Sequence, residues 1–282
     1  MGEALDSRRP CVEPGRMYET LTLQREGHLT WLTLDRPGSL NAMSTTLVRE
    51  LRQFFWELPD DTETRVLVLR GAGRAFCAGL DLKEQPSGEG AGGGSVAAGL
   101  RAQRTISELV LLMRRAPQPI IAAVHGAACG GGFALALAAD VRIAGESARM
   151  NAAFIRLGLS ACDVGVSYFL PRIVGASVAA ELLLTGNFID AARAERVGLV
   201  SRVVPDAGLE EAARALAQEM LRNSPLGLRL TKECLKLSLD AGSLEEVVAM
   251  EDRNQILAAR GADFREGVMA FLEKRPARFR DA

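Results

Sequence analysis

The sequence has 282 residues, enough for one large core or for a core with a smaller appendage. Hydrophobic residues make up 48% and charged residues 24%, which is typical of soluble globular proteins, and a formal net charge of −1 gives no sign of a nucleic-acid partner. Five cysteines without a CxxC pair and only two histidines argue against a disulfide framework, a metal site and a His-based triad. We therefore expect a cytoplasmic protein without a metal, with an organellar matrix as the open alternative.

The N-terminal segment 1–17 contains basic, acidic and proline residues in close succession. It lacks the hydrophobic core of a secretory signal, so we predict a flexible tail. No apolar run elsewhere in the sequence is long enough to span a membrane, and we expect no membrane partner.

The first elements after the tail are predicted from alternation and from capping signals. Thr20–Leu23 and Leu29–Leu34 alternate apolar and polar residues and are predicted to form a β-hairpin. Ser44 is predicted to cap a helix that ends near Leu58. The short apolar run Val66–Leu69 is predicted to be a strand in the interior of a sheet.

A segment rich in glycine and serine, Gln85–Gly99, follows and is predicted to be a mobile loop. It is either a tolerated insertion or a flap over a site, and the sequence leaves both open. The amphipathic run Arg101–Arg114 is predicted to be the next helix.

The second half adds apolar strands and ends in helices. Strands are predicted at Ile120–Val124, Val141–Ala144 and Leu199–Val203, and Leu209–Leu272 is predicted to be helical with breaks. This order predicts an α/β protein with a helical C-terminal extension. We expect a tail at 1–17, a core at 18–205 and a C-terminal helical region at 206–282.

Three consecutive glycines, Gly130–Gly132, lie between the strand Ile120–Val124 and an Ala/Leu-rich run that is predicted to be a buried helix. The first turn of a helix has unpaired N–H groups and a partial positive charge, and glycine lets a ligand approach them closely. The turn could therefore bind an oxygen that carries negative charge. Glycines before a helix can also serve close packing alone, and this alternative stays open.

A second turn with glycine, Ala75–Lys83, follows the predicted strand Val66–Leu69 and places another backbone N–H at Ala78. Two such donors that converge on one oxygen form an oxyanion hole. We therefore expect the N–H groups of Ala78 and Gly131 to lie together.

In these motifs the sequence resembles the crotonase, or enoyl-CoA hydratase/isomerase, superfamily. The resemblance covers about residues 18–279 and rests on motifs that follow one another in the order of the family. These motifs are Leu34–Pro37 with Asn41–Ala42, Ala75–Leu82, Gly130–Gly132 with Asp140–Ala144, Leu184–Gly186, Gly198–Val200 with Val204–Pro205, and Glu266–Gly267 with Ala270–Arg275.

The resemblance implies a spiral of ββα units with a C-terminal helical trimerisation region, and trimers that often pair into hexamers. It implies an acyl-CoA thioester as substrate, with no cofactor beyond the CoA of the substrate itself. Its carbonyl oxygen would bind to the N–H groups of Ala78 and Gly131. Lys83, Phe271 and Lys274 would contact the CoA, although Phe271 could instead be a core residue and Lys274 a solvated charge.

The sequence departs from the family's hydratases, which use two glutamates for acid–base chemistry. By counting, their positions hold Ala134 and Phe154, and neither residue can transfer a proton. Asp163 remains nearby and resembles the aspartate of family isomerases, one residue later relative to Gly158. Since moving a double bond needs only one base, we expect an isomerase with Asp163 as its acid and base. Asp163 could also be the N-cap of a helix that starts near Val164.

Two other functions stay open at this point. The chain could be a hydratase, or could catalyse another enolate reaction such as decarboxylation or thioester hydrolysis. It could also be a catalytically inactive acyl-CoA-binding protein, which the missing glutamates would permit.

Overall fold

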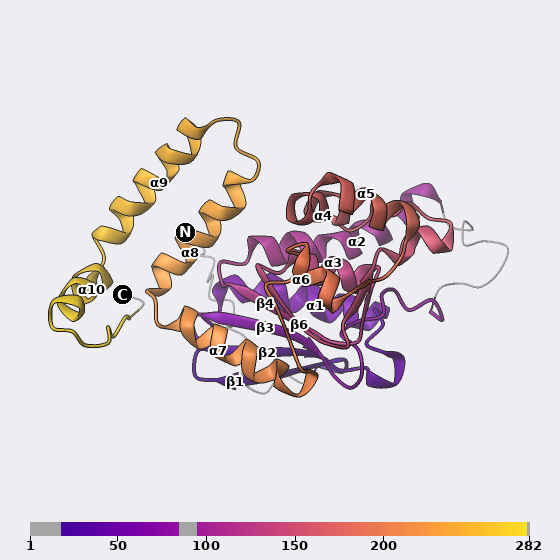
Figure 1. The fold of residues 1–282 in the computed structure, drawn as a ribbon, viewed down its shortest axis with the longest axis horizontal. Coiled ribbons are helices and arrows are strands. Elements are labelled where there is room, and N and C mark those ends of the chain that lie inside the picture. Colours follow the sequence, from indigo (N-terminus) through magenta and orange to yellow (C-terminus); the bar gives the residue numbers. More distant parts are fainter. Residues whose placement is uncertain (1–17, 85–94, 281–282) are drawn as a thin grey trace, which may run out of the picture.

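The computed structural model describes residues 18–84 and 95–280. The expected N-terminal tail and residues 85–94 of the predicted Gly-rich loop lie outside the described residues. A mixed sheet with helices on both faces forms the core, and three helices extend away from it (Figure 1).

The main sheet has the strand order β1-β2-β3-β4-β6-β9. β1 and β2 form the predicted antiparallel hairpin, and every other pair in this sheet is parallel. Its strands are β1 (Leu21–Glu26), β2 (Leu29–Leu34), β3 (Val66–Gly71), β4 (Ile120–Val124), β6 (Val141–Gly145) and β9 (Arg202–Val204). A second, smaller sheet contains β5 (Ala127–Cys129), β7 (Arg149–Asn151) and β8 (Ile189–Asp190).

Ten α-helices accompany these sheets in the described part of the chain. They are α1 (Thr45–Glu57), α2 (Val96–Arg115), α3 (Gly131–Ala138), α4 (Val166–Val174), α5 (Ala176–Thr185), α6 (Ala191–Arg196), α7 (Leu209–Leu221), α8 (Pro225–Ser238), α9 (Leu244–Ala259) and α10 (Ala262–Leu272). The predicted cap of α1 is confirmed, because the Ser44 hydroxyl accepts the N–H of Leu47. None of the helices described in 18–84 and 95–280 combines the length and the apolar character that a bilayer crossing requires.

The core lies on both faces of the main sheet, because successive strand residues point to opposite sides. On β3, Leu67 and Leu69 join the large cluster under α1, α2 and α3. Val66 and Val68 join the other cluster, which α7 covers. α7 therefore packs on the sheet although it follows the expected boundary at residue 205.

One predicted strand begins later than expected. Leu199–Val203 was predicted to be extended, but β9 begins only at Arg202. The N–H groups of Leu199 and Val200 both bond to the carbonyl of Ala194, so these two buried residues close the end of α6 instead.

α8, α9 and α10 form an arm that extends beyond the sheet (Figure 1). Its α8 is fixed to the core by Lys232, whose side chain is 7% exposed. The Lys232 ammonium lies 2.8 Å from an Asp140 carboxylate oxygen and donates to the Gln118 carbonyl at 2.7 Å. Burial lowers the pKa of Lys232, and the charge of Asp140 opposes this shift.

Candidate functional site

The two turns that contain glycine lie side by side. Cys77 pairs with Ala128 in a parallel bridge, and the N–H of Cys129 donates to the carbonyl of Cys77 at 3.0 Å. A Cβ atom on Gly132 would lie 2.2 Å from that same carbonyl oxygen. Only glycine at position 132 therefore allows the two turns to approach this closely.

Gly131 is the first residue of α3, a helix whose residues are all buried. Its N–H has no hydrogen-bond acceptor within the described part of the chain. The preceding Gly130 has a φ of +50°, a conformation that glycine adopts without strain. The Gly131 amide is therefore an open donor at the positive end of a helix, as predicted.

The Ala78 amide is not open in the same way. Its N–H donates to the Leu40 carbonyl at 3.0 Å, so it could reach a ligand only by giving up that bond. The sequence predicts a free N–H at Ala78, but the structure shows that this N–H is bonded to the loop that contains Leu40, which is distant in the sequence.

The open amide of this turn belongs to Leu80. Met43 and Leu80 form a parallel bridge. The Met43 N–H donates to the Gly79 carbonyl at 2.7 Å, and the Met43 carbonyl accepts the N–H of Asp81 at 3.1 Å. In this pattern the N–H of Leu80 faces away from Met43, and no described residue accepts it. A Cβ on the neighbouring Gly79 would lie 3.7 Å from the Gly131 nitrogen, so the two turns meet at this point.

Asp163 lies in the loop before α4 and is partly buried. Its Oδ1 accepts a hydrogen bond from the Gln103 side-chain amide at 2.6 Å and from the N–H of Val164 at 2.7 Å. α4 begins at Val166 with Gly165 as its N-cap, and no side chain caps it. The carboxylate of Asp163 is therefore not the N-cap of this helix.

The two positions that the resemblance assigns to glutamates hold apolar side chains near the triple glycine. Ala134 is fully buried on α3, one turn after Gly131. The Phe154 ring lies against Gly130, where a Cβ atom would be 3.4 Å from the ring. This part of the site therefore contributes apolar surface and no titratable group.

Two cysteines lie in these turns, and neither is activated. Burial raises the pKa of the Cys77 thiol to about 12 and that of Cys129 to about 11. Both thiols are therefore protonated at neutral pH, whereas the thiolate is the nucleophilic form. They act here as small packing residues.

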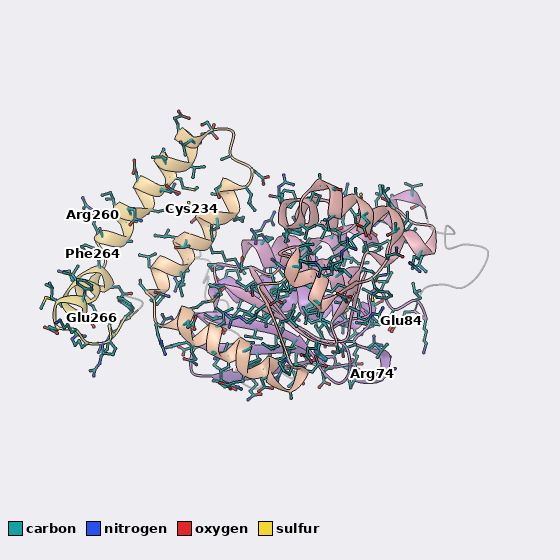
Figure 2. The ribbon with its side chains drawn as sticks, in the orientation of Figure 1. Arg74, Glu84, Cys234, Arg260, Phe264 and Glu266 are labelled. Carbon is teal, nitrogen blue, oxygen red and sulfur yellow. The ribbon has the colours of Figure 1, made fainter. Side chains whose placement is uncertain are left out.

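The three predicted CoA contacts do not come together within one chain. Lys83 is exposed and follows the Leu80 turn, next to Glu84. Phe271, which is 83% exposed, and the exposed Lys274 lie at the end of α10. Figure 2 shows Glu84 and the α10 residues Phe264 and Glu266 at opposite ends of the molecule.

The comparisons with known proteins agree with this architecture. The family model for enoyl-CoA hydratase/isomerase matches residues 24–282. A probable enoyl-CoA hydratase of Mycobacterium tuberculosis H37Rv is 42% identical over 254 residues, which is 89% of this chain and 88% of that protein. The 1,2-epoxyphenylacetyl-CoA isomerase of Escherichia coli K12 is 36% identical over 266 residues, which is 93% of this chain and 99% of that protein.

Solved structures are similar over nearly the whole chain. A putative enoyl-CoA hydratase from Streptomyces coelicolor superimposes with a TM-score of 0.90 at 36% identity, covering 99% of this chain and 100% of that one. A monofunctional enoyl CoA isomerase from M. smegmatis reaches 0.69 at 41% identity, covering 81% of this chain and 98% of that one. The chain thus belongs to the enoyl-CoA hydratase/isomerase family and has the crotonase fold.

Proposed function

We propose that this enzyme moves a carbon–carbon double bond within an acyl-CoA thioester. The N–H groups of Gly131 and Leu80 bind the thioester oxygen, and Leu80 replaces Ala78 in this role because the Ala78 N–H is paired with Leu40. Asp163 is the acid and base. The observation that carries the proposal is the apolar pair Ala134 and Phe154 at the positions where hydratases of the family have glutamates.

The chemistry follows from where charge develops. Removal of a proton next to the thioester moves negative charge onto the carbonyl oxygen, and two fixed donors stabilise it. Loss of one donor would cost about 3 kcal/mol of transition-state stabilisation. One carboxylate can take the proton from one carbon and return it to another, whereas hydration needs a further group to hold and activate the water.

Relatives support both family reactions. The E. coli relative is named an isomerase, and the M. smegmatis structure is described as an enoyl CoA isomerase. Several other relatives are named probable enoyl-CoA hydratases, which keeps hydration as the second candidate.

Liquid chromatography coupled to mass spectrometry separates these functions, because chromatography resolves the 2-enoyl- and 3-enoyl-CoA isomers, which have the same mass. Purified protein is incubated with a 3-enoyl-CoA and, separately, with a 2-enoyl-CoA. Interconversion of the two at unchanged mass supports isomerisation. A product heavier by one water identifies a hydratase instead, and tight binding without turnover identifies an inactive acyl-CoA-binding protein.

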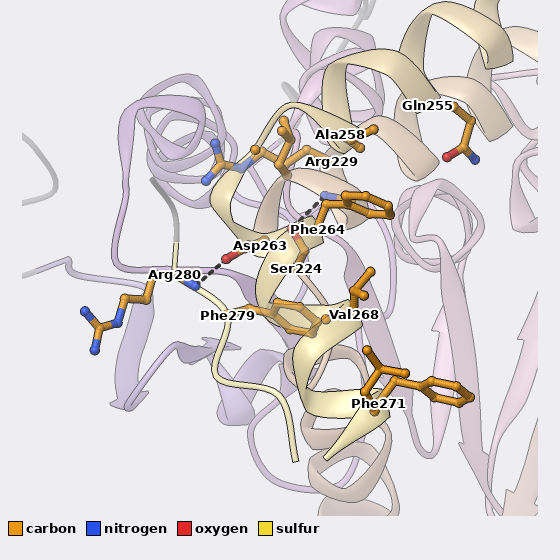
Figure 3. A pocket seen from close by; sticks show the side chains of 16 residues that line it. Ser224, Arg229, Gln255, Ala258, Asp263, Phe264, Val268, Phe271, Phe279 and Arg280 are labelled. Carbon is orange, nitrogen blue, oxygen red and sulfur yellow. Dashed lines mark hydrogen bonds between the residues drawn. The ribbon is translucent and has the colours of Figure 1, made fainter. Parts of the chain in front are cut away.

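We further propose that the chain assembles into a homotrimer, or into a hexamer of paired trimers, through its C-terminal arm. An apolar cavity of about 830 Å³ lies between α8, α9 and α10, and Figure 3 shows Phe264, Val268, Phe271 and Phe279 around it. Phe271 and Lys274 are far from the Lys83 turn of their own chain, so in this assembly they would contact the CoA bound to a neighbour.

A further inference from the structure

An ion pair involves the residue that follows the open Leu80 amide. Arg36, in the loop after β2, has its Nη1 atom 2.9 Å from Oδ2 of Asp81, the residue that follows Leu80. The Arg36 and Asp81 side chains are 21% and 9% exposed, so water screens this pair far less than a surface pair. The Arg36 guanidinium also donates to the carbonyl of Ala42, which precedes Met43, the bridge partner of Leu80; Arg36 thereby links the segment of Leu80 to the segment that pairs with it.

The loop that carries Arg36 is itself fixed to the core. Asn41 is fully buried, and its side-chain amide donates to the carbonyls of Ala72 at 2.9 Å and Ala75 at 2.7 Å. Its side-chain oxygen accepts the backbone N–H of Arg36 at 2.9 Å. Arg36 therefore reaches Asp81 from a rigid support.

The segment after Leu80 is held through Asp81 and Glu84. The Asp81 N–H donates to the Met43 carbonyl at 3.1 Å, and the Glu84 carboxylate accepts the N–H of Thr45 at 2.8 Å and lies 4.0 Å from the Arg36 guanidinium. Asp81 is its last buried side chain, since Leu82, Lys83 and Glu84 are exposed. Oδ1 of Asp81 accepts the N–H of Lys83 at 3.2 Å. This bond orients the carboxylate so that its other oxygen, Oδ2, faces Arg36. The Arg36 guanidinium lowers the pKa of Asp81, so the carboxylate keeps its charge at neutral pH.

We propose that Arg36 and Asp81 are positioning residues of the oxyanion hole: their ion pair fixes the Leu80 N–H in the direction that meets the thioester oxygen. This inference rests on the proposed function, because it takes the Leu80 and Gly131 amides as the oxygen-binding pair. Fixed donors stabilise developing charge better than mobile ones, since they need no reorganisation during the reaction.

The test is Asp81→Asn, which keeps the side-chain shape but removes the charge. Its matched control is Asp61→Asn, because Asp61 is also buried and bonds to an arginine, Arg25, at 2.9 Å. The probe is 3-phenylpropenoyl-CoA carrying carbon-13 in the thioester carbonyl. It has no hydrogen on the carbon beyond its double bond, so that bond cannot migrate. Infrared difference spectra of the bound probe report how strongly the donors polarise the carbonyl.

In the wild type, binding should lower the carbonyl stretching frequency relative to water. Asp81→Asn should lose much of that shift. On a 3-enoyl-CoA substrate it should reduce kcat by roughly 10- to 100-fold, with KM within about threefold of the wild-type value. Asp61→Asn should keep both the shift and kcat. A full shift in folded Asp81→Asn would overturn the inference.

Arg36→Lys decides the matter if Asp81→Asn does not fold. Lysine retains the charge on a shorter side chain and lacks the planar guanidinium, whose Nη1 donates to both Ala42 and Asp81, so part of the shift should disappear. A full shift in Arg36→Lys would then overturn the inference. A wild-type protein that binds the probe without any shift would instead overturn the oxyanion site itself, and this outcome is recognised before any variant is made.

Discussion

The side-chain amide of Gln103 on α2 donates to Asp163 Oδ1 over 2.6 Å and thereby links this helix to the loop before α4. The same oxygen accepts the N–H of Val164 at 2.7 Å. One carboxylate oxygen is thus held by two donors, and Oδ2 receives no hydrogen bond from the described residues. In the proposed reaction this second oxygen is the one that meets the substrate carbon.

Gln103→Leu should reduce kcat by roughly tenfold and leave KM nearly unchanged, because the carboxylate loses one of the two donors that orient it. Steady-state kinetics on a 3-enoyl-CoA check this. Gln53→Leu is the matched control, since Gln53 also donates to a carboxylate on a helix surface, that of Glu57 at 3.1 Å. Equal kcat values for the two variants would show that Gln103 has no part in orienting Asp163.

Asp163→Asn should reduce kcat by about 100- to 10,000-fold, because asparagine cannot accept and return a proton. Binding of an acyl-CoA product, measured by isothermal titration calorimetry, should change little. Cys162→Ser alters the exposed neighbouring side chain and should leave turnover at the wild-type level. Undiminished turnover in Asp163→Asn would remove this residue from the proposed mechanism.

Gly132→Ala should lower both stability and activity. The new Cβ would lie 2.2 Å from the Cys77 carbonyl oxygen and force the two turns apart, at a cost of about 1–3 kcal/mol. Gly99→Ala is the contrasting change, because Gly99 lies in α2 with nothing within 4 Å of its Cβ position. That substitution should stabilise the protein by about 0.5–1 kcal/mol. Urea unfolding measures the free energy of unfolding of both variants. If Gly132→Ala is as stable as Gly99→Ala, the two turns can move apart without cost and the prediction is wrong.

Glu50 should make folding sensitive to acid. Burial raises the pKa of this carboxyl, but bonds from the Thr20 hydroxyl and from the N–H groups of Glu19 and Thr20 outweigh it and lower the pKa overall. A lowered folded pKa gives stability that is present above the unfolded value of about 4.3 and is lost as pH falls through the folded value.

Glu50→Gln should therefore lower the free energy of unfolding at pH 7. Between about pH 5 and about pH 3, the range around the pKa of an unfolded carboxyl, the variant should lose less further stability than the wild type. Urea unfolding at these pH values measures both effects. Glu219→Gln, on the exposed side of α7, should change neither. If Glu50→Gln loses stability in acid as steeply as the wild type, Glu50 is not the group responsible.

Phe264→Asp should dissociate the proposed oligomer, because it places a charge in the apolar cavity of the arm. Size-exclusion chromatography with light scattering should give a trimer or hexamer for the wild type and a smaller species for the variant. Leu184→Asp makes the same kind of change at an exposed leucine of α5 and should leave the mass unchanged. A monomeric wild type would contradict the proposed assembly.

Local signals predicted much of this molecule. The β1–β2 hairpin, the Ser44 cap and the open Gly131 amide each depend on residues that are close in the sequence. Counting from the triple glycine also identified Phe154, whose ring does lie against Gly130.

Pairings between distant segments could not be predicted in this way. Which amide of the Ala75–Lys83 turn stays open depends on Leu40 and Met43, more than 30 residues earlier in the sequence. Lys232 is a charged residue on an amphipathic helix, yet its ammonium is buried because Asp140 and Gln118 meet it there. The Arg36–Asp81 pair joins two motifs of the family resemblance, Leu34–Pro37 and Ala75–Leu82. Membership in these motifs is the sequence feature that could have pointed to the pair.

The anchoring of the arm has a consequence for the proposed oligomer. α3 has 8 residues and is about 12 Å long; it begins with the Gly131 amide and ends just before Asp140, the partner of Lys232 on α8. Strain that a neighbouring subunit exerts on the arm would pass along this one short helix to the oxygen-binding amide. If the proposed oligomer forms, catalytic centres within it are therefore expected to influence one another's turnover.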